Sequence, residues 1–287
     1  MAEFSSLREA VGSLVRDGDA VALEGFTHLI PFAAGHELVR QQRRGLTLIR
    51  MTPDIIYDQM IGMGCGSRIV FSWGGNPGVG SLHRFRDAIE NGWPAPVEIE
   101  EHSHADMAAS YQAGASGLPF AVMRGYVGSD LPKFNERIQP ITCPFTGEVL
   151  TATPALNPDV TIIHAQKADR RGNVAIFGIV GIQKEAALAA KKVIVTVEEI
   201  VDDLNAPVNA CILPAWVISC ISVVPGGAHP SYAHGYYKRD NLFCKAWDGI
   251  SRDREQFRAW MNRHVLGTKD FAEYRRSIES EMKVGHA

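Results

Sequence analysis

Short apolar runs alternate with amphipathic stretches through the first 115 residues of the chain. The runs are four to six residues long, rich in β-branched side chains and closed by glycine or turn residues, as buried strands are. Between them, apolar residues recur at helical spacing. The pattern predicts strands over 20–23, 46–51, 69–73 and 97–100. It predicts helices from Ser6 to the Asp17-Gly18-Asp19 turn and over 32–41, 54–61 and 105–115, with a further helix following Ser81 as its N-cap. This alternation predicts an α/β fold, with a mostly parallel sheet, helices on both faces and right-handed crossovers.

The pattern changes over residues 119–158, which are rich in Pro, Gly and Thr and show little periodicity. We expect an irregular insertion here, or a lid over one end of the sheet. Regular patterning then resumes. It predicts strands over 159–164, 174–177 and 192–197, strand pieces within 211–224, and helices over 184–191, 254–265 and 269–281. Because no repeat or linker interrupts the chain, residues 1–287 are expected to form a single domain.

Composition narrows the class of protein. The net charge is -3 and no run of Lys or Arg occurs, so nucleic acid is not expected as a partner. No apolar run approaches the roughly 20 residues that span a bilayer, and the N-terminus makes a poor signal peptide. The five cysteines are widely spaced and form no Cys-x-x-Cys pair. They are expected to be reduced thiols in a cytoplasmic protein.

The segment from Gly74 to Gly80 holds four glycines and one proline in seven residues, between a predicted strand and a predicted helix. Such a loop suits an anion, because its N–H groups can point outward near the positive end of the helix dipole. Gly75, Asn76 and Gly78 are candidate donors to an oxyanion. A sharp turn without a ligand explains the same glycines equally well. The loop is not a Walker A motif, since no Gly-Lys-Ser/Thr follows.

Several polar residues lie where substrate would meet such a sheet. Ser81, His83 and Arg84 begin the helix after the glycine loop, and Arg84 could pair with a carboxylate of the substrate. An exposed helix surface is the competing interpretation. Phe26 and Thr27 follow the first strand, at the carboxyl edge where ligands of parallel sheets bind. Polar residues also gather at Glu98, Glu100, Glu101, His102, His104 and Asp106, and a second glycine loop spans 225–230.

These features occur in ordered blocks that cover essentially the whole chain. The blocks are ALEGFTHLIPFAA from Ala22, RMTPDIIYDQMIG from Arg50, SWGGNPGVGSLHRFRDA from Ser72, EIEEHSHAD from Glu98, SGLPF from Ser116, TCPFTGE from Thr142, IHAQKADRRGN from Ile163 and VPGGAHPS from Val224. With them the chain resembles the A (alpha) subunits of class I CoA-transferases, in the glutaconate CoA-transferase branch. Glu24 stands where the broader pattern has glycine, which suits that branch.

The resemblance implies the sheet-based fold of these enzymes and a site between an A and a B chain. The nucleophilic glutamate belongs to the B chain, within a Ser-Glu-Asn-Gly motif that is absent here. The expected reaction moves CoA from succinyl-CoA to 3-oxoadipate, as in aromatic compound degradation, and the expected assembly is an α2β2 heterotetramer. A CoA thioester is expected as substrate, with no metal and no permanently bound cofactor. Glu101 and its neighbours would line the acyl pocket, although capping and surface charge explain that cluster equally well.

Three other functions stay open at this point. A glutaconate-type transferase uses a different acid pair on the same fold. A ring-opening CoA-thioester hydrolase would replace the accepting acid by water. A non-catalytic metabolite-binding regulator is the remotest of the three, because no segment suited to DNA binding is evident.

Overall fold

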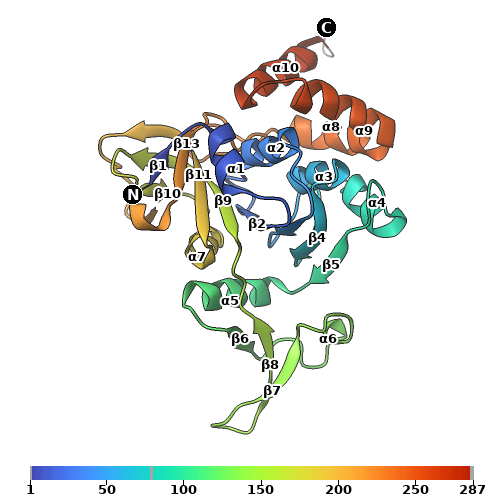
Figure 1. Ribbon diagram of the computed structural model, residues 1–287, viewed down its shortest axis with the longest axis vertical. Coiled ribbons are helices and arrows are strands. Elements are labelled where there is room, and N and C mark those ends of the chain that lie inside the picture. Colours follow the sequence, from blue (N-terminus) through green and yellow to red (C-terminus); the bar gives the residue numbers. More distant parts are fainter. Residues whose placement is uncertain (1, 78–79, 285–287) are drawn as a thin grey trace.

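A mostly parallel ten-stranded sheet forms the centre of the computed structural model, which describes residues 2–77 and 80–284 (Figure 1). Its main path has the order β1-β13-β11-β9-β2-β3-β4-β5. These strands are β1 Glu3–Phe4, β13 Cys220–Val223, β11 Lys192–Val201, β9 Val160–Asp169, β2 Ala20–Glu24, β3 Leu46–Ile49, β4 Gly66–Phe71 and β5 Glu98–Glu101. All neighbours along the path are parallel, so the predicted fold class is confirmed.

Two strands of the sheet are longer than their apolar runs predicted. The central strands β9 and β11 each have ten residues, and the last residues of β9 turn back into an antiparallel pair with β10 Val174–Ile176. β10 also pairs with β12 Cys211–Leu213. The first part of each long strand is apolar and buried, as expected for a strand covered on both faces. The strand predicted over 174–177 is confirmed as β10. The extension of β9 beyond its apolar run carries more polar residues, so the prediction for 159–164 ended too early.

Helices cover both faces of the sheet, as predicted. One face is covered by α1 Leu7–Leu14, α2 Phe32–Arg40, α3 Ile55–Gly62 and α4 His83–Asn91. The helices α8 Asn241–Arg252, α9 Arg254–Met261 and α10 Phe271–Val284 pack outside these helices (Figure 1). α9 continues into a π-helical turn over Asn262–Leu266. The other face is covered by α5 His104–Ala115 and α7 Gln183–Ala189. α8 was not among the predicted helices, although its Phe243, Cys244 and Trp247 are buried at helical spacing. No helix among the described residues is long and apolar enough to cross a membrane.

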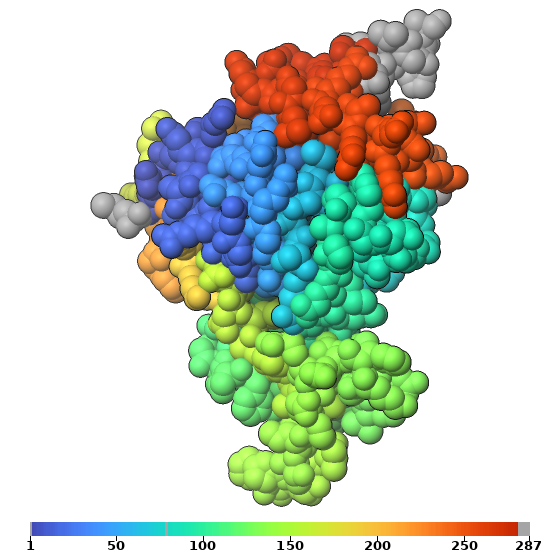
Figure 2. Space-filling view, turned by 45° about the vertical axis from the view of Figure 1, so that its right-hand side comes forward, coloured from blue at the N-terminus to red at the C-terminus, as the bar shows by residue number. Residues whose placement is uncertain are grey.

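The segment predicted as an irregular insertion is instead a small antiparallel sheet, and this corrects the prediction for 119–158. Its order is β6-β8-β7, with β6 Phe120–Met123, β8 Val149–Pro154 and β7 Gln139–Thr142, and α6 Leu131–Phe134 lies before β7. Pro140 and Pro154 lie within these strands, where proline argues against a strand assignment. The segment projects from the body of the molecule beyond α5 (Figures 1 and 2).

A buried ionic network fastens this projection to the main sheet. The His102 ring lies between two carboxylates, with Nδ1 at 2.5 Å from Asp106 Oδ2 and Nε2 at 2.8 Å from Glu100 Oε1. Asp106 also accepts hydrogen bonds from Tyr126 and Thr153, both in the projecting segment. Within the predicted polar cluster, Glu100, His102 and Asp106 thus form a structural network. Within residues 2–77 and 80–284, no group of His, Cys, Asp and Glu side chains is arranged to hold a metal ion.

The network predicts a loss of stability in alkaline solution. Burial alone would lower the pKa of His102, but the bonds to Asp106 and Glu100 outweigh it and raise the pKa to about 9. Protonation of His102 therefore stabilises the fold fully below the unfolded pKa of about 6.5, and this contribution is lost as the pH rises through about 9. We expect a loss on the order of 2–3 kcal/mol in the free energy of unfolding.

Urea titrations at pH values from about 6.5 to about 9 should show this loss, and the His102→Gln variant should not show it. Parallel profiles for the two proteins would contradict the assignment.

Candidate functional site

An open pocket of about 180 Å³ lies at the carboxyl ends of four adjacent parallel strands. Its lining residues follow β2, β3, β4 and β5 in turn, and they are Phe26, Thr27, Arg50, Thr52, Asp54, Trp73, Gly75, Pro77 and His104. This is the edge at which open α/β sheets bind ligands. The structure therefore brings together Phe26, Thr27 and Gly75, three of the residues predicted from the sequence. The rest of the lining consists of Arg50, Thr52, Asp54, Trp73, Pro77 and His104. Of these, His104 had been noted as part of the polar cluster and Pro77 as part of the glycine loop.

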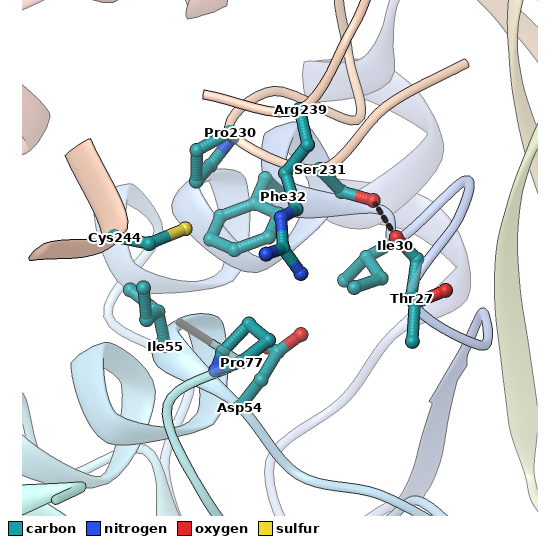
Figure 3. Close-up of a pocket in the computed structure, with 10 residues that line it drawn as sticks. All are labelled: Thr27, Ile30, Phe32, Asp54, Ile55, Pro77, Pro230, Ser231, Arg239 and Cys244. Carbon is teal, nitrogen blue, oxygen red and sulfur yellow. Dashed lines mark hydrogen bonds between the residues drawn. The ribbon is translucent and has the colours of Figure 1, made fainter. Parts of the chain in front are cut away.

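A narrower pocket adjoins the open one and shares Thr27, Asp54 and Pro77 with it (Figure 3). Its other walls are the apolar Ile30, Phe32 and Ile55, together with Pro230, Ser231, Arg239 and Cys244. Pro230 and Ser231 belong to the second glycine loop and its continuation, for which the sequence favoured no role. The structure makes this segment a wall of the inner pocket.

The turn after β2 is shaped by tight backbone contacts. A Cβ at Gly25 would lie 2.7 Å from the carbonyl oxygen of Leu29, so only glycine fits there. Thr27 and Leu29 both have left-handed backbone conformations, with φ of 56° and 53°. The hydroxyl of Ser231 donates a 3.0 Å hydrogen bond to the Thr27 carbonyl and holds the turn against the second loop (Figure 3). Such strained positions tend to occur at functional sites.

Buried charges lie directly beneath this turn. Arg50 donates to Asp54 Oδ1 at 3.2 Å and to the Gly25 carbonyl at 2.8 Å, and it is 1% exposed. Glu24 accepts hydrogen bonds from Tyr111 and from the backbone N–H of Met51. Burial raises the pKa of Glu24 to about 7, against the opposing effect of Arg50. Arg50 thus joins the ends of β2 and β3 and supports the floor of the pocket.

His104 is held in one orientation at the N-terminus of α5. The hydroxyl of Ser72 donates to the Met51 carbonyl at 2.6 Å and lies 3.1 Å from His104 Nδ1. Because Ser72 donates its single hydroxyl proton to the Met51 carbonyl, the His104 Nδ1–H must donate to the Ser72 oxygen. In the neutral ring, Nε2 is therefore the acceptor. This fixes which nitrogen of His104 is free to accept a proton or a hydrogen bond.

The proposed oxyanion donors have structural partners instead. The backbone N–H of Gly75 donates to the Pro53 carbonyl at 3.1 Å. The buried side-chain amide of Asn76 donates to the Cys244 carbonyl of α8 at 2.7 Å. Gly78 lies outside the described residues. For Gly75 and Asn76 the expectation of free donors facing an oxyanion is thus corrected, because these groups hold the loop in place.

The helix after the glycine loop begins later than expected, at His83, and its N-cap position is Leu82 rather than Ser81. The first turn is capped by a residue of another helix. Asp58 of α3 accepts hydrogen bonds from the N–H groups of Arg84 and Phe85, both at 2.8 Å. Burial raises the pKa of Asp58 to about 6. The anion that the sequence predicted at this helix end is therefore the protein's own carboxylate.

The other residues at this helix start also contact α8. Asp248 of α8 accepts from the Ser81 N–H at 3.2 Å and lies 2.9 Å from His83 Nε2. The buried guanidinium of Arg84 donates to Asp87 and to the Arg252 carbonyl, both at 2.9 Å, and lies over the Trp93 ring. Arg84 is thus neither exposed nor directed at a ligand, which corrects the prediction that it faces substrate.

Glu101 is an exposed residue at the carboxyl end of β5. Its carbonyl accepts a 2.7 Å hydrogen bond from the Asn135 amide, and its side chain is not among those lining either pocket. The buried acid of this strand is Glu100, which belongs to the His102 network. Glu101 therefore lies at the same sheet edge as the open pocket but outside it.

Comparison with known proteins identifies the family. A family model described as coenzyme A transferase matches residues 4–223. The chain belongs to the coenzyme A transferase family. Among the relatives of this CoA-transferase chain, the A subunit of 3-oxoadipate CoA-transferase of Pseudomonas knackmussii is 67% identical over 278 residues, which is 97% of this chain and 99% of that protein. The A subunit of glutaconate CoA-transferase of Acidaminococcus fermentans is 32% identical over 294 residues, covering 96% and 91% of the two chains.

The fold agrees with this assignment. The crystal structure of glutaconate coenzyme A-transferase from Acidaminococcus fermentans matches the CoA-transferase chain with a TM-score of 0.87 and 31% identity. The match covers 96% of this chain and 93% of that chain. The resemblance found in the sequence motifs is therefore confirmed both at the level of the family and at the level of the fold.

Proposed function

We propose that this chain is the A subunit of a heteromeric CoA-transferase that moves CoA from succinyl-CoA to 3-oxoadipate, giving 3-oxoadipyl-CoA and succinate. The observation that carries the proposal is 67% identity, over nearly the whole of both chains, with a protein named for that activity. The open pocket at the carboxyl edge of the sheet supports it, because it offers a place for the acyl group.

The chemistry needs a carboxylate nucleophile, which we assign to a partner B subunit. The partner's glutamate attacks the thioester carbonyl of succinyl-CoA, and CoA leaves as a thiolate with formation of an anhydride. The thiolate then attacks the glutamyl carbonyl of the anhydride, giving glutamyl-CoA and releasing succinate. A carboxylate of 3-oxoadipate then attacks the glutamyl-CoA carbonyl, which releases the CoA thiolate and forms a second anhydride. The thiolate attacks the 3-oxoadipyl carbonyl of this anhydride, giving 3-oxoadipyl-CoA and freeing the glutamate. The CoA thioester is thus a substrate and not a bound cofactor.

Within this chain, the open pocket supplies walls and polar groups for the acyl end of the substrate. Phe26 and Trp73 are 38% and 53% exposed and offer apolar surface at its rim. The oriented Nε2 of His104 and the Thr27 segment offer polar contacts. Glu101 lies at the same sheet edge, where a second subunit could complete the site. We propose an α2β2 assembly in the cytoplasm, in keeping with the five free cysteines.

The acceptor specificity is tested with the enzyme assembled from both subunits. We expect kcat/KM to be highest for 3-oxoadipate when succinyl-CoA is the donor, because the 67% identical relative carries that activity in its name. The assay should include glutaconate as a competing acceptor, and it should follow succinyl-CoA loss without any acceptor acid. A preference for glutaconate would favour the glutaconate-type alternative. Rapid hydrolysis without an acceptor would favour a thioester hydrolase.

A further inference from the structure

Arg239 extends into the inner pocket from the segment that joins the second glycine loop to α8. Its guanidinium lies among Thr27, Asp54 and Pro77, near the junction with the open pocket (Figure 3). Its Nε donates to Asn241 Oδ1 at 2.7 Å, which fixes the plane of the group. Among the described residues, no carboxylate lies within ion-pair distance of this guanidinium. The two terminal nitrogens are therefore available to a ligand.

The charges around the inner pocket favour an anionic group there. The acid that lines this pocket is Asp54, which is already paired with Arg50 at 3.2 Å and caps α3 through the Ile56 N–H. Because Arg50 and Asp54 pair with each other, the Arg239 guanidinium is left without an acidic partner in this pocket. The walls contributed by Ile30, Phe32 and Ile55 are apolar. A charge-assisted hydrogen bond is stronger in such surroundings than in open water.

The position of Arg239 is fixed by its neighbours in the chain. Asp240 lies 3.0 Å from His229 Nε2 and caps α8 through the Phe243 N–H at 2.9 Å. Ser231 ties the preceding segment to the Thr27 carbonyl. A guanidinium mounted in this way presents a planar pair of donors with little loss of conformational entropy, which suits bidentate binding of a carboxylate.

We propose that Arg239 binds the carboxylate of the substrate that is remote from the thioester, and so selects dicarboxylic over monocarboxylic acids. The proposal rests on the CoA-transfer function above and names a specificity-determining residue for it. The acyl end would occupy the open pocket, and the remote carboxylate would reach the Arg239 guanidinium at the junction of the two pockets, between Thr27 and Pro77. This is the role that the sequence suggested for Arg84, whose guanidinium is buried elsewhere.

The test compares Arg239→Gln with the native chain in the enzyme assembled from both subunits. The acceptors are 3-oxoadipate and 3-oxohexanoate, which differ only in the remote carboxylate. Loss of a charge-assisted contact should lower kcat/KM for 3-oxoadipate by about 10- to 150-fold. The value for 3-oxohexanoate should stay the same or rise. Arg239→Lys should restore part of the loss, since it keeps the charge but not the planar donors. Lys238→Gln, at an exposed neighbour, is the matched control and should change neither value.

Thermal unfolding of each variant separates folding defects from specificity. An equal fall for both acceptors, or no change for either, would overturn the role of Arg239. If the native enzyme prefers glutaconate, the same comparison is made between glutaconate and crotonate, so the Arg239 assignment can stand when the 3-oxoadipate assignment fails. A native enzyme that accepts monocarboxylic acids as well as dicarboxylic ones would contradict the Arg239 assignment alone.

Discussion

Replacing Asp58 by alanine is expected to lower the free energy of unfolding by about 3–5 kcal/mol. The side chain is fully buried and accepts three hydrogen bonds, from the N–H groups of Arg84 and Phe85 and from Trp247 Nε1 at 3.0 Å. Removing it leaves three buried donors without this acceptor, and a buried donor left unsatisfied costs about 1–3 kcal/mol. Asp58→Asn keeps one acceptor oxygen and should cost less. Equilibrium denaturation in urea measures both changes.

Asp253 provides a matched control for Asp58. It also caps a helix, accepting from the N–H groups of Glu255 and Gln256 at the start of α9, but those bonds are exposed to solvent. Asp253→Ala should cost only about 1 kcal/mol, as exposed N-caps do. Equal losses for the two alanine variants would mean that Asp58 acts as an ordinary cap and that the contact to Trp247 contributes nothing.

The isolated chain is expected to transfer CoA at least about 10³-fold more slowly than the assembled enzyme. The reason is chemical, since loss of a covalent nucleophile typically costs on the order of 10⁴–10⁶ in turnover. The buried acid Glu24, beneath the open pocket, is bonded to Tyr111 and Met51 within the fold and is not presented to a substrate. Steady-state assays of the two separate proteins and of their mixture measure the difference. Turnover by the purified chain at the rate of the mixture would contradict the two-subunit mechanism.

The fold could be predicted because it depends on local patterns. Apolar strands of four to six residues, alternating with amphipathic helices, define a parallel sheet without reference to distant contacts. The elements that were not predicted also have physical explanations. The strands β7 and β8 contain prolines, which argued against assigning them as strands. Few residues of the projecting segment are buried, so its sequence shows little alternation of apolar and polar residues. The stripe of Phe243, Cys244 and Trp247 could have revealed α8, since its spacing is helical.

The candidate site was predicted only where strand ends define it. Phe26 and Thr27 follow β2, and the rule that ligands meet the carboxyl edge of a parallel sheet places them in the open pocket. The roles of Asn76, His83 and Arg84 could not be read in the same way. Their partners Cys244, Asp248 and Arg252 lie more than 160 residues away in the chain. The sequence alone does not show whether a hydrogen-bond donor is already bonded to an acceptor that is distant in the chain.

The central claim is tested most directly by determining which subunit becomes covalently attached to CoA. The assembled enzyme is incubated with succinyl-CoA without an acceptor acid, quenched, and the intact masses of both subunits are recorded. A glutamyl-CoA thioester on the partner, with this chain unmodified, is the predicted result. Adding 3-oxoadipate before the quench should discharge the adduct. An adduct on this chain, or turnover with no adduct on either protein, would contradict the assignment of this chain as the non-nucleophilic subunit of a CoA-transferase.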